Sequence, residues 1–168
     1  AASPHLAIDP VVISAQVISA VQTIISRSTD PVDKALISIT KINAGTAYNV
    51  IDDQVKMGGT IRTFRRETRA YIEKRLNELC KGIADAHGAE IKIEFDLVNK
   101  YPPTINSKEE TKFAANVAKD LVGDDKVITD IDPSMGGEDF SYLLEKKPGS
   151  YLYLGQGDEE HSAHLHTT

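Results

Sequence analysis

Residues 54–64 read Gln54-Val55-Lys56-Met57-Gly58-Gly59-Thr60-Ile61-Arg62-Thr63-Phe64. Two residue classes alternate along this stretch, which is the period-2 pattern of a β-strand with one buried face. One face would carry Val55, Met57, Gly59 and Ile61. The other would carry Lys56, Gly58, Thr60 and Arg62. The pattern therefore predicts a strand that covers a core with its apolar face. Its polar face would look at water, a partner or a ligand.

The residues after this strand predict a helix and then another strand. From Arg66 apolar residues recur at helical spacing as far as Gly88, and glycine commonly ends helices. The stripe consists of Ile72, Leu76, Leu79, Ile83 and Ala86. Residues 90–98 then alternate apolar and charged side chains, so we expect a strand there.

The residues before the strand predict a helix and a strand as well. Asp9-Pro10 is typical of a helix start, because Asp accepts hydrogen bonds at the N-cap and Pro fits the first turn. Apolar residues follow at a spacing of three or four, and the helix ends by Asp30-Pro31. The stripe is Ile13, Val17, Ala20, Val21 and Ile24. Residues 35–43 predict a strand, with a turn over 43–45.

The order α-β-β-α-β is that of a ferredoxin-like βαββαβ unit without its first strand. Only residues 1–3 remain to represent that strand, so we expect the chain to begin within a domain. After Tyr101-Pro102-Pro103, helices over 108–122 and 137–145 alternate with short strands over 126–129 and 150–154. These four elements are too small for an independent core, so we expect them to belong to a larger sheet. The predicted fold class is α+β.

The composition argues against several classes of function. The net charge of -6 disfavours nucleic acid as a partner, because phosphate binding requires clustered Lys and Arg. The single cysteine, Cys80, excludes an internal disulfide and is typical of a reducing compartment. No apolar run approaches the roughly 20 residues that span a bilayer, since the longest, over 11–25, is broken by five polar residues, and no secretory signal is visible. We expect a cytoplasmic protein that binds neither nucleic acid nor membrane.

Three histidines near the C-terminus are the densest candidate for a metal site. His161, His164 and His166 offer imidazoles, which are good ligands for zinc or manganese. A metal site needs three or four ligands that converge from several segments, and no second cluster is visible in the sequence. A polar tail or part of a purification tag would have the same composition, so both interpretations stay open.

A second candidate is Met135-Gly136-Gly137-Glu138-Asp139-Phe140. Two glycines that lead into a helix can bring backbone N–H groups close to an anionic ligand. Alternatively, Glu138 and Asp139 complement the dipole of their own helix. Gly137 and Glu138 are therefore candidates for either a pocket or a structural role.

Arg62 is the third candidate, because it shares the polar strand face with Lys56 and Thr60. A guanidinium binds a carboxylate through two parallel hydrogen bonds, although most surface arginines are simply solvated. Asn49 could be a turn residue and nothing more. His5 lies near a chain end, where a solvated histidine is the usual case. Cys80 lies beside the apolar stripe of its helix and is best interpreted as a small core residue.

Seven short stretches of the chain occur in a recognisable order. They are Ala1-Ala2-Ser3-Pro4-His5, Asp9-Pro10-Val11, Asn49-Val50-Ile51, Gly59-Thr60-Ile61-Arg62, Tyr101-Pro102-Pro103-Thr104-Ile105-Asn106, Gly137-Glu138-Asp139-Phe140 and Leu165-His166-Thr167. Together they resemble the aminoacylase-like metallopeptidases and amidohydrolases of peptidase family M20, in the branch of hippurate hydrolases and auxin-conjugate hydrolases. One departure is Asp52, where the family usually has Pro.

The resemblance implies a two-domain subunit that forms a homodimer. Residues 1–98 would be the ferredoxin-like lid and dimerisation domain, with its first strand truncated. Residues 99–168 would be the C-terminal part of the α/β metal-binding catalytic domain.

The resemblance also implies two divalent ions (zinc, manganese or cobalt) that activate a water, with a glutamate as general base. Among the family's ligands only the C-terminal histidine has a counterpart, His166. The metal site in this chain is therefore incomplete, and the chain carries no catalytic residue. Asn49 and Arg62 match the lid residues that hold the substrate's carbonyl and carboxylate. A further lid histidine, which acts across the dimer, would fall immediately before Ala1, so His5 is not that residue.

The implied function is hydrolysis of the amide bond of N-acyl amino acids, or of peptides with a free carboxylate, by the whole protein. This chain alone is expected to be inactive. A non-catalytic dimerisation or amino-acid-sensing module would share the α-β-β-α-β order, but it would not need the 137–140 motif or His166. An RNA-binding sheet would need exposed aromatic residues on a strand face. The predicted strand at 90–98 offers charged residues there instead.

Overall fold

The computed structural model describes residues 1–96 and 101–155 and divides the chain into two compact units. Unit 1 consists of Ala1–Pro103 with Pro133–Gly137, and unit 2 consists of Thr104–Asp132 with Glu138–Thr168. The chain mixes helices with a small sheet, as the α+β prediction requires.

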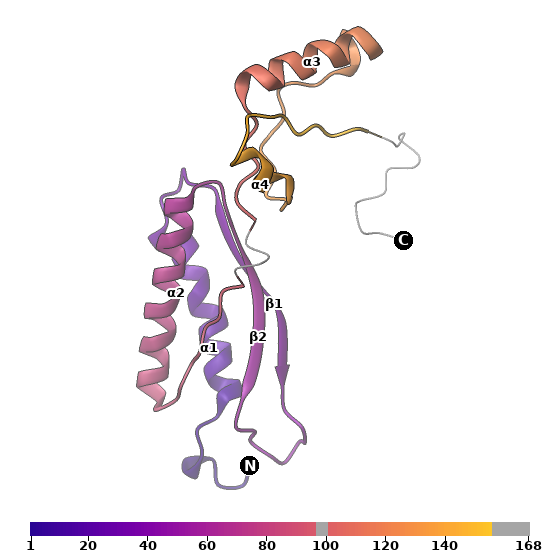
Figure 1. The fold of residues 1–168 in the computed structure, drawn as a ribbon. Coiled ribbons are helices and arrows are strands. Elements are labelled where there is room, and N and C mark those ends of the chain that lie inside the picture. Colours follow the sequence, from indigo (N-terminus) through magenta and orange to yellow (C-terminus); the bar gives the residue numbers. More distant parts are fainter. Residues whose placement is uncertain (97–100, 156–168) are drawn as a thin grey trace. The chain divides into compact units, whose positions relative to one another are not determined.

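Unit 1 is a β-hairpin with two helices packed on one face (Figure 1). The elements are α1 (Pro10–Thr23), which continues as a π-helical turn (Ile24–Ser28), then β1 (Ala35–Ala44), β2 (Val55–Thr63) and α2 (Arg66–His87). A short 3-10 turn, Pro4–Leu6, precedes them. All four main elements lie where the sequence predicts them.

The start and the buried stripe of α1 confirm the helix prediction. Asp9 Oδ1 accepts hydrogen bonds from the amides of Val11 at 2.9 Å and Val12 at 3.3 Å, and Pro10 occupies the first turn. These bonds satisfy two of the amides that a helix start leaves without a partner. The buried apolar residues are Ile13, Val17, Val21 and Ile24.

Pro10–Ser28 is also long and apolar enough to cross a membrane, with 19 residues and a mean hydropathy of 1.3. The same length and composition suit a core helix, and the buried stripe of α1 packs inside unit 1. The Ser14, Ser19 and Thr23 hydroxyls each donate to a carbonyl one turn earlier. One face of this helix is thus part of the core of unit 1. The prediction that no apolar run approaches the length of a span is therefore wrong for this helix by length and composition.

The strands pair antiparallel, with Ile37 opposite Ile61 and Leu36 opposite Arg62. A bulge between Ile39 and Lys41 shifts the register. Met57 and Ile61 pack against the core formed by the helices, as the alternation of residues 54–64 predicts. The opposite face of β2 carries the exposed Lys56 and Thr60 and the half-buried Arg62.

α2 confirms the predicted stripe and the predicted end. Ile72 is fully buried and Cys80 nearly so, and Leu76, Leu79 and Ile83 pack against the same cluster. The helix ends at Gly88, whose φ of 64° lies in the left-handed region that favours glycine. Near the N-terminus of α2, Asp33 accepts a hydrogen bond from Thr68 Oγ1 at 3.0 Å and pairs with Arg65 Nη1 at 3.0 Å. These contacts attach the start of α2 to the residues that lead into β1.

The predicted strand over residues 90–98 is wrong for the part that the structure describes. Residues 90–96 form no strand, and 97 and 98 lie outside the described residues. Burial nevertheless alternates along this segment, because Ile91 and Ile93 pack against the core while Lys92 and Glu94 are exposed. A strand requires a hydrogen-bonded neighbour, and the described sheet contains only β1 and β2.

Unit 2 contains α3 (Lys108–Val122), a 3-10 turn (Asp124–Lys126) and α4 (Phe140–Leu144). The prediction for α3 is confirmed. The helix predicted over 137–145 is shorter than expected, and the strands predicted over 126–129 and 150–154 are wrong.

Side chains take the place of a strand ladder in unit 2. Asn106 donates through Nδ2 to the Tyr151 carbonyl at 2.9 Å, and its Oδ1 accepts from the Tyr151 amide at 2.7 Å. Ser107 and Gly149 exchange a similar pair of bonds, at 2.8 and 3.1 Å. With these backbone groups satisfied by Asn106 and Ser107, residues 150–154 remain outside any sheet.

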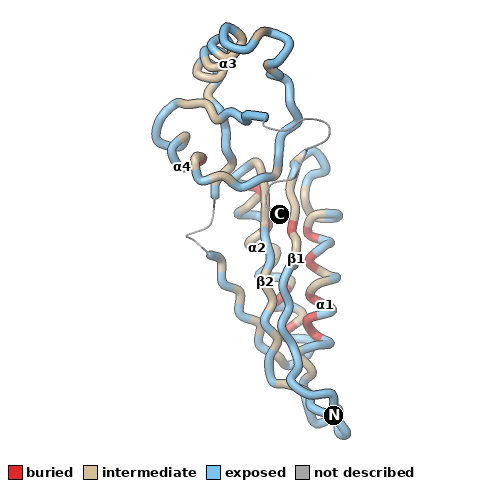
Figure 2. Tube along the Cα trace, turned by 90° about the vertical axis from the view of Figure 1, so that its right-hand side faces the viewer, coloured by how far each residue is buried: buried red, intermediate tan, exposed pale blue. Residues whose placement is uncertain are grey.

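Unit 2 lacks a core of its own within its described residues. α3 has no buried residue (Figure 2), and Phe113 and Leu121 are 71% and 78% exposed. Ser141 is the one fully buried side chain in the described part of this unit. This agrees with the expectation that these elements belong to a larger layer.

Two valines of α1 provide a matched test of the core of unit 1. Val21 is 0% exposed and Val12 is 52% exposed, so their replacement by alanine changes helix propensity equally but burial differently. Val21→Ala should lower the free energy of unfolding by about 2 kcal/mol, from two buried methyl groups at ~0.8 kcal/mol each plus a cavity. Val12→Ala should stay within about 0.5 kcal/mol of wild type. Urea unfolding measures both, and equal losses would contradict the proposed core.

Candidate functional site

Arg62 lies near the end of β2, where its side chain is half-buried. Its Nη1 donates a hydrogen bond to the carbonyl oxygen of Met135 at 2.9 Å. Met135 is 73 residues away in sequence but belongs to the same compact unit. The guanidinium has five N–H donors, and this is the one that a described residue accepts. Arg62 is therefore held in place while retaining donors for a further acceptor.

Two further segments of unit 1 approach the Arg62 guanidinium. A Cβ built on Gly137 would lie 3.0 Å from Arg62 Nη1 and 3.1 Å from Tyr101 Cδ2. The structure thus brings together the predicted site residues Arg62 and Gly137, with Tyr101 and the Met135 carbonyl beside them. Sequence reasoning did not single out Met135 for its carbonyl, because a main-chain oxygen leaves no signal in the residue type.

Asn49 lies in the loop that joins β1 to β2, and it is exposed. Its carbonyl oxygen accepts a hydrogen bond from the Ala1 amino group at 2.8 Å. The N-terminus lies at the loop end of the hairpin, opposite the end where β2 leads into α2 (Figure 1). Seven residues separate Val55 from Arg62, or roughly 23 Å of strand at ~3.3 Å per residue. Asn49 and Arg62 therefore lie at opposite ends of the hairpin, and the fold does not bring them together in one copy.

Glu138 belongs to a hydrogen-bonded cluster in unit 2. Tyr151 Oη donates to Glu138 Oε2 at 2.9 Å, and the Phe140 amide approaches Glu138 Oε1 at 3.5 Å. The bond from Tyr151 is the main reason that the pKa of Glu138 lies below its ordinary value. The same bond raises the pKa of Tyr151. The Phe140 and Tyr151 rings pack with their centroids 5.6 Å apart, so this arrangement has the character of a structural anchor.

The predicted anion-binding arrangement before α4 is not what the described residues form. α4 begins at Phe140 and has five residues, so Gly137 precedes the helix instead of opening it. Such a short helix has little dipole with which to attract an anion. Gly137 contacts the surroundings of Arg62, and Glu138 contacts Tyr151.

The predicted metal ligand His166 lies outside the described residues, as do His161 and His164. His5 is exposed. In residues 1–96 and 101–155, no three His, Cys, Asp or Glu side chains come together in a way that could hold a metal ion. The described residues alone therefore do not fit a metal site.

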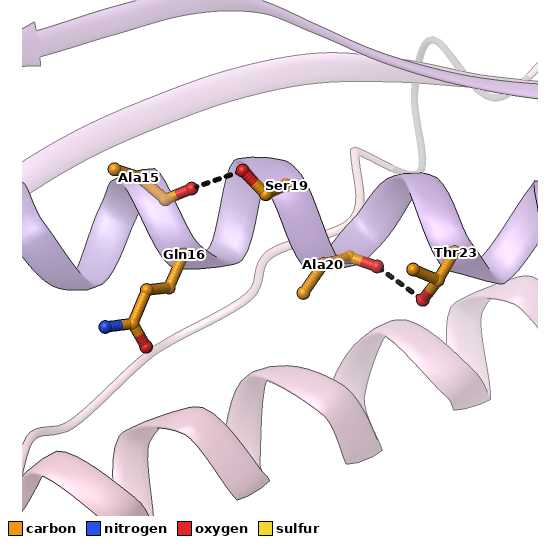
Figure 3. Close-up of a pocket in the computed structure, with 5 residues that line it drawn as sticks. All are labelled: Ala15, Gln16, Ser19, Ala20 and Thr23. Atoms are coloured by element: carbon orange, nitrogen blue, oxygen red, sulfur yellow. Dashed lines mark hydrogen bonds between the residues drawn. The ribbon is translucent and has the colours of Figure 1, made fainter.

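A shallow groove on α1 is lined by Ala15, Gln16, Ser19, Ala20 and Thr23 (Figure 3). Two of its polar groups are already bonded within the helix, because Ser19 Oγ donates to Ala15 O at 3.1 Å and Thr23 Oγ1 to Ala20 O at 2.6 Å. Gln16 Oε1 lies 2.9 Å from His87 Nε2 of α2. The Gln16–His87 contact thus links α1 to α2, whereas the two hydroxyl bonds are local to α1. Cys80 is a buried core residue, as predicted, and burial raises the pKa of its thiol.

Residues 5–168 match peptidase family M20/M25/M40. The chain belongs to this family. The chain is 37% identical to the IAA-amino acid hydrolase ILR1-like 2 of Arabidopsis thaliana, in an alignment that covers 95% of this chain and 36% of that protein. The hippurate hydrolase of Campylobacter jejuni is also 37% identical, over 99% of this chain and 42% of that protein.

A solved structure of an M20 protein supports the same assignment. The YxeP protein of Bacillus subtilis, described as a dinuclear metal binding peptidase from the M20 family, has 33% identity and a TM-score of 0.66. The alignment covers 85% of this chain and 35% of that one. The chain therefore spans well under half the length of these M20 relatives.

The Glu138–Tyr151 bond predicts a specific dependence of stability on pH. Because the folded state lowers the pKa of Glu138, its contribution is present above the ordinary value of 4.5 and is lost as pH falls through the lowered value. The raised pKa of Tyr151 contributes below 10.0 and is lost as pH rises through the raised value. Tyr151→Phe keeps the ring and removes both contributions, so its stability deficit should be largest between these limits and shrink beyond each.

Urea unfolding across pH measures the deficit, and NMR titration should show the pKa of Glu138 rising toward 4.5 in Tyr151→Phe. The exposed Tyr153 is the control, since Tyr153→Phe removes a hydroxyl from a ring that packs on Tyr151. An unchanged Glu138 pKa in Tyr151→Phe would show that the bond does not form in solution.

Proposed function

We propose that the whole protein hydrolyses the amide bond of N-acyl amino acids, or of small peptides with a free carboxylate, and that Arg62 binds that carboxylate. The observation that carries this proposal is the half-buried Arg62 guanidinium, held by the Met135 carbonyl with its other donors available to a ligand. A charge-assisted pair of hydrogen bonds from such a fork is strong and selective for carboxylates. The printed functions of the M20 relatives, hippurate hydrolase and IAA-amino acid hydrolase, support this substrate class.

A non-catalytic sensing module remains the second interpretation, but less supports it. The family match extends from residue 5 to residue 168 and so includes the 137–140 motif and His166. A lid-like module alone would have no need of either.

We assign residues 1–98 to a ferredoxin-like lid and residues 99–168 to part of the catalytic domain. The α-β-β-α order of unit 1, with both helices on one face of the hairpin, supports the lid assignment (Figure 1). The open apolar surface of unit 2 supports its place in a larger layer.

Divalent metal ions in the whole protein are supported by family membership and by the description of the YxeP structure. His166 is the ligand that this chain would supply. Because the described residues do not form a metal site, the 168-residue chain should not hydrolyse N-acyl amino acids even with added zinc or manganese. Metal-dependent turnover by a mass-verified sample of the chain would contradict this.

The positions of Asn49 and Arg62 support the proposal of a homodimer. They lie roughly 23 Å of strand apart at ~3.3 Å per residue, which exceeds the length of a small N-acyl amino acid. If both hold the same substrate, one copy must supply Arg62 and the other copy Asn49. A two-fold dimer through the lid would then form two equivalent sites, each with residues from both copies.

Replacement of Arg62 should change the preference between acids and amides. Loss of a charge-assisted pair in a closed site costs about 2–5 kcal/mol, so Arg62→Ala should lower kcat/KM for N-acyl amino acids by roughly 30-fold or more. The corresponding amides have no carboxylate to lose and should hardly respond. Arg62→Lys restores the charge without the fork and should recover partly. Lys56→Ala, an exposed position on the same strand face, is the control. An unchanged ratio of acid to amide turnover in Arg62→Ala would remove this role from Arg62.

Mixing two variants tests whether a site draws on both copies. Asn49→Ala and Arg62→Ala homodimers should each be weakly active. After subunit exchange, random pairing makes half of the dimers mixed, and one site in each mixed dimer has both wild-type residues. Activity should therefore return to roughly one quarter of wild type. A double variant, with both changes on one chain, should give no such recovery with either single variant. Failure of the two single variants to complement would show that each site uses Asn49 and Arg62 of the same copy.

A further inference from the structure

Gly137 is tightly surrounded, and its own backbone conformation does not explain why glycine stands there. Its φ is not positive, and neither is that of Gly136, so any residue could adopt either conformation. The difference between the two glycines lies in their neighbours. A Cβ at Gly137 would meet Arg62 Nη1 at 3.0 Å and Tyr101 Cδ2 at 3.1 Å, whereas a Cβ at Gly136 would meet only the Ser134 hydroxyl oxygen, at 3.3 Å. Glycine at 137 therefore leaves room for the guanidinium and the ring.

The Met135 carbonyl holds the same guanidinium through a hydrogen bond. The 2.9 Å bond from Nη1 ties Arg62 to a main-chain oxygen two residues before Gly137. An arginine side chain loses considerable rotamer entropy when it is fixed. A guanidinium that is already held in position loses less of that entropy when it binds a ligand.

From these contacts we propose that Gly137 and the Met135 carbonyl are positioning elements for Arg62, and that they set the preference of the enzyme for substrates with a free carboxylate. This inference rests on the proposed function, in which Arg62 binds the carboxylate. Gly137 admits the guanidinium close to the backbone, and the Met135 carbonyl orients it. The role proposed for both groups acts through Arg62, which each of them contacts or closely approaches.

Gly137→Ala tests the proposal, and Gly136→Ala is the matched control in the same segment. The new methyl group at 137 must displace the guanidinium or the Tyr101 ring by a few tenths of an ångström. The ratio of kcat/KM for N-acyl amino acids to that for their amides should fall about tenfold in the whole enzyme, less than the roughly hundredfold that a 1 Å misplacement can cost. Gly136→Ala should keep the ratio of wild type. Equal ratios in the two variants would overturn the proposal.

A double-variant cycle separates positioning from a general loss of structure. Lysine has no Nη1, so in an Arg62→Lys background Gly137→Ala should change the acid-to-amide ratio no further. A further fall in that background would show that Gly137 acts through something other than Arg62, and would overturn the proposal.

A second readout needs no catalysis. In the 168-residue chain, the NMR signal of the Arg62 side-chain Nε–H should shift in Gly137→Ala and stay in place in Gly136→Ala. An unshifted signal in folded Gly137→Ala would overturn the positioning role. The two proposals also fail separately. If Arg62→Ala leaves the acid-to-amide ratio unchanged, the proposed carboxylate site is wrong, whatever Gly137 does. If Arg62→Ala lowers the ratio and Gly137→Ala does not, only the positioning role is wrong.

Discussion

The packing of α1 and α2 against one face of the β1–β2 hairpin is the contact on which the rest of unit 1 depends. Val21, Ile24 and Ile72 are at most 1% exposed. The first two lie on α1 and the π-helical turn that continues it, and Ile72 lies on α2. A two-stranded hairpin is at best marginally stable in water, so its shape has to be maintained by the helices. The polar face of β2, which carries Arg62, is thus held in place by apolar side chains that never contact it.

In the described residues of unit 2, no helix packs on a sheet in this way. α3 is as strongly amphipathic as a core helix should be, yet Phe113 and Leu121 remain exposed. Outside the helices of this unit, side chains bond to backbone groups, with Asn106 bonded to both the amide and the carbonyl of Tyr151. Polar bonds of this kind fix local geometry but remove little apolar surface from water. The unit therefore has defined turns and an unfilled apolar surface, as expected for one part of a larger layer.

Local patterns predicted the elements whose partners are close in sequence. Asp9-Pro10 and Gly88 marked helix ends correctly, because capping involves only neighbouring residues. The strands predicted over 90–98, 126–129 and 150–154 failed for the described residues, because a strand depends on a neighbour that alternation cannot supply. The alternation correctly predicted that Ile91 and Ile93 pack against the core, but it wrongly predicted a paired strand there. In the same way the sequence drew attention to Arg62 and Gly137 but could not show that they meet. The Met135 carbonyl belongs to the backbone, and no residue pattern encodes it.

The hairpin has a further consequence, because its length acts as a fixed spacer. β2 runs from Val55 to Thr63 and is held extended by its pairing with β1, so the loop that carries Asn49 and the end that carries Arg62 stay apart. If a short, flexible segment joined Asn49 to Arg62, one copy could close both residues around a small substrate. The paired strand β2 does not allow this. The register of β1 against β2, with its bulge between Ile39 and Lys41, therefore does more than complete a sheet. This pairing sets the separation between the two ends of the hairpin, where Asn49 and Arg62 lie. If Asn49 and Arg62 bind the same substrate, as proposed above, the core that supports this extended hairpin favours a site shared between two copies over a site within one.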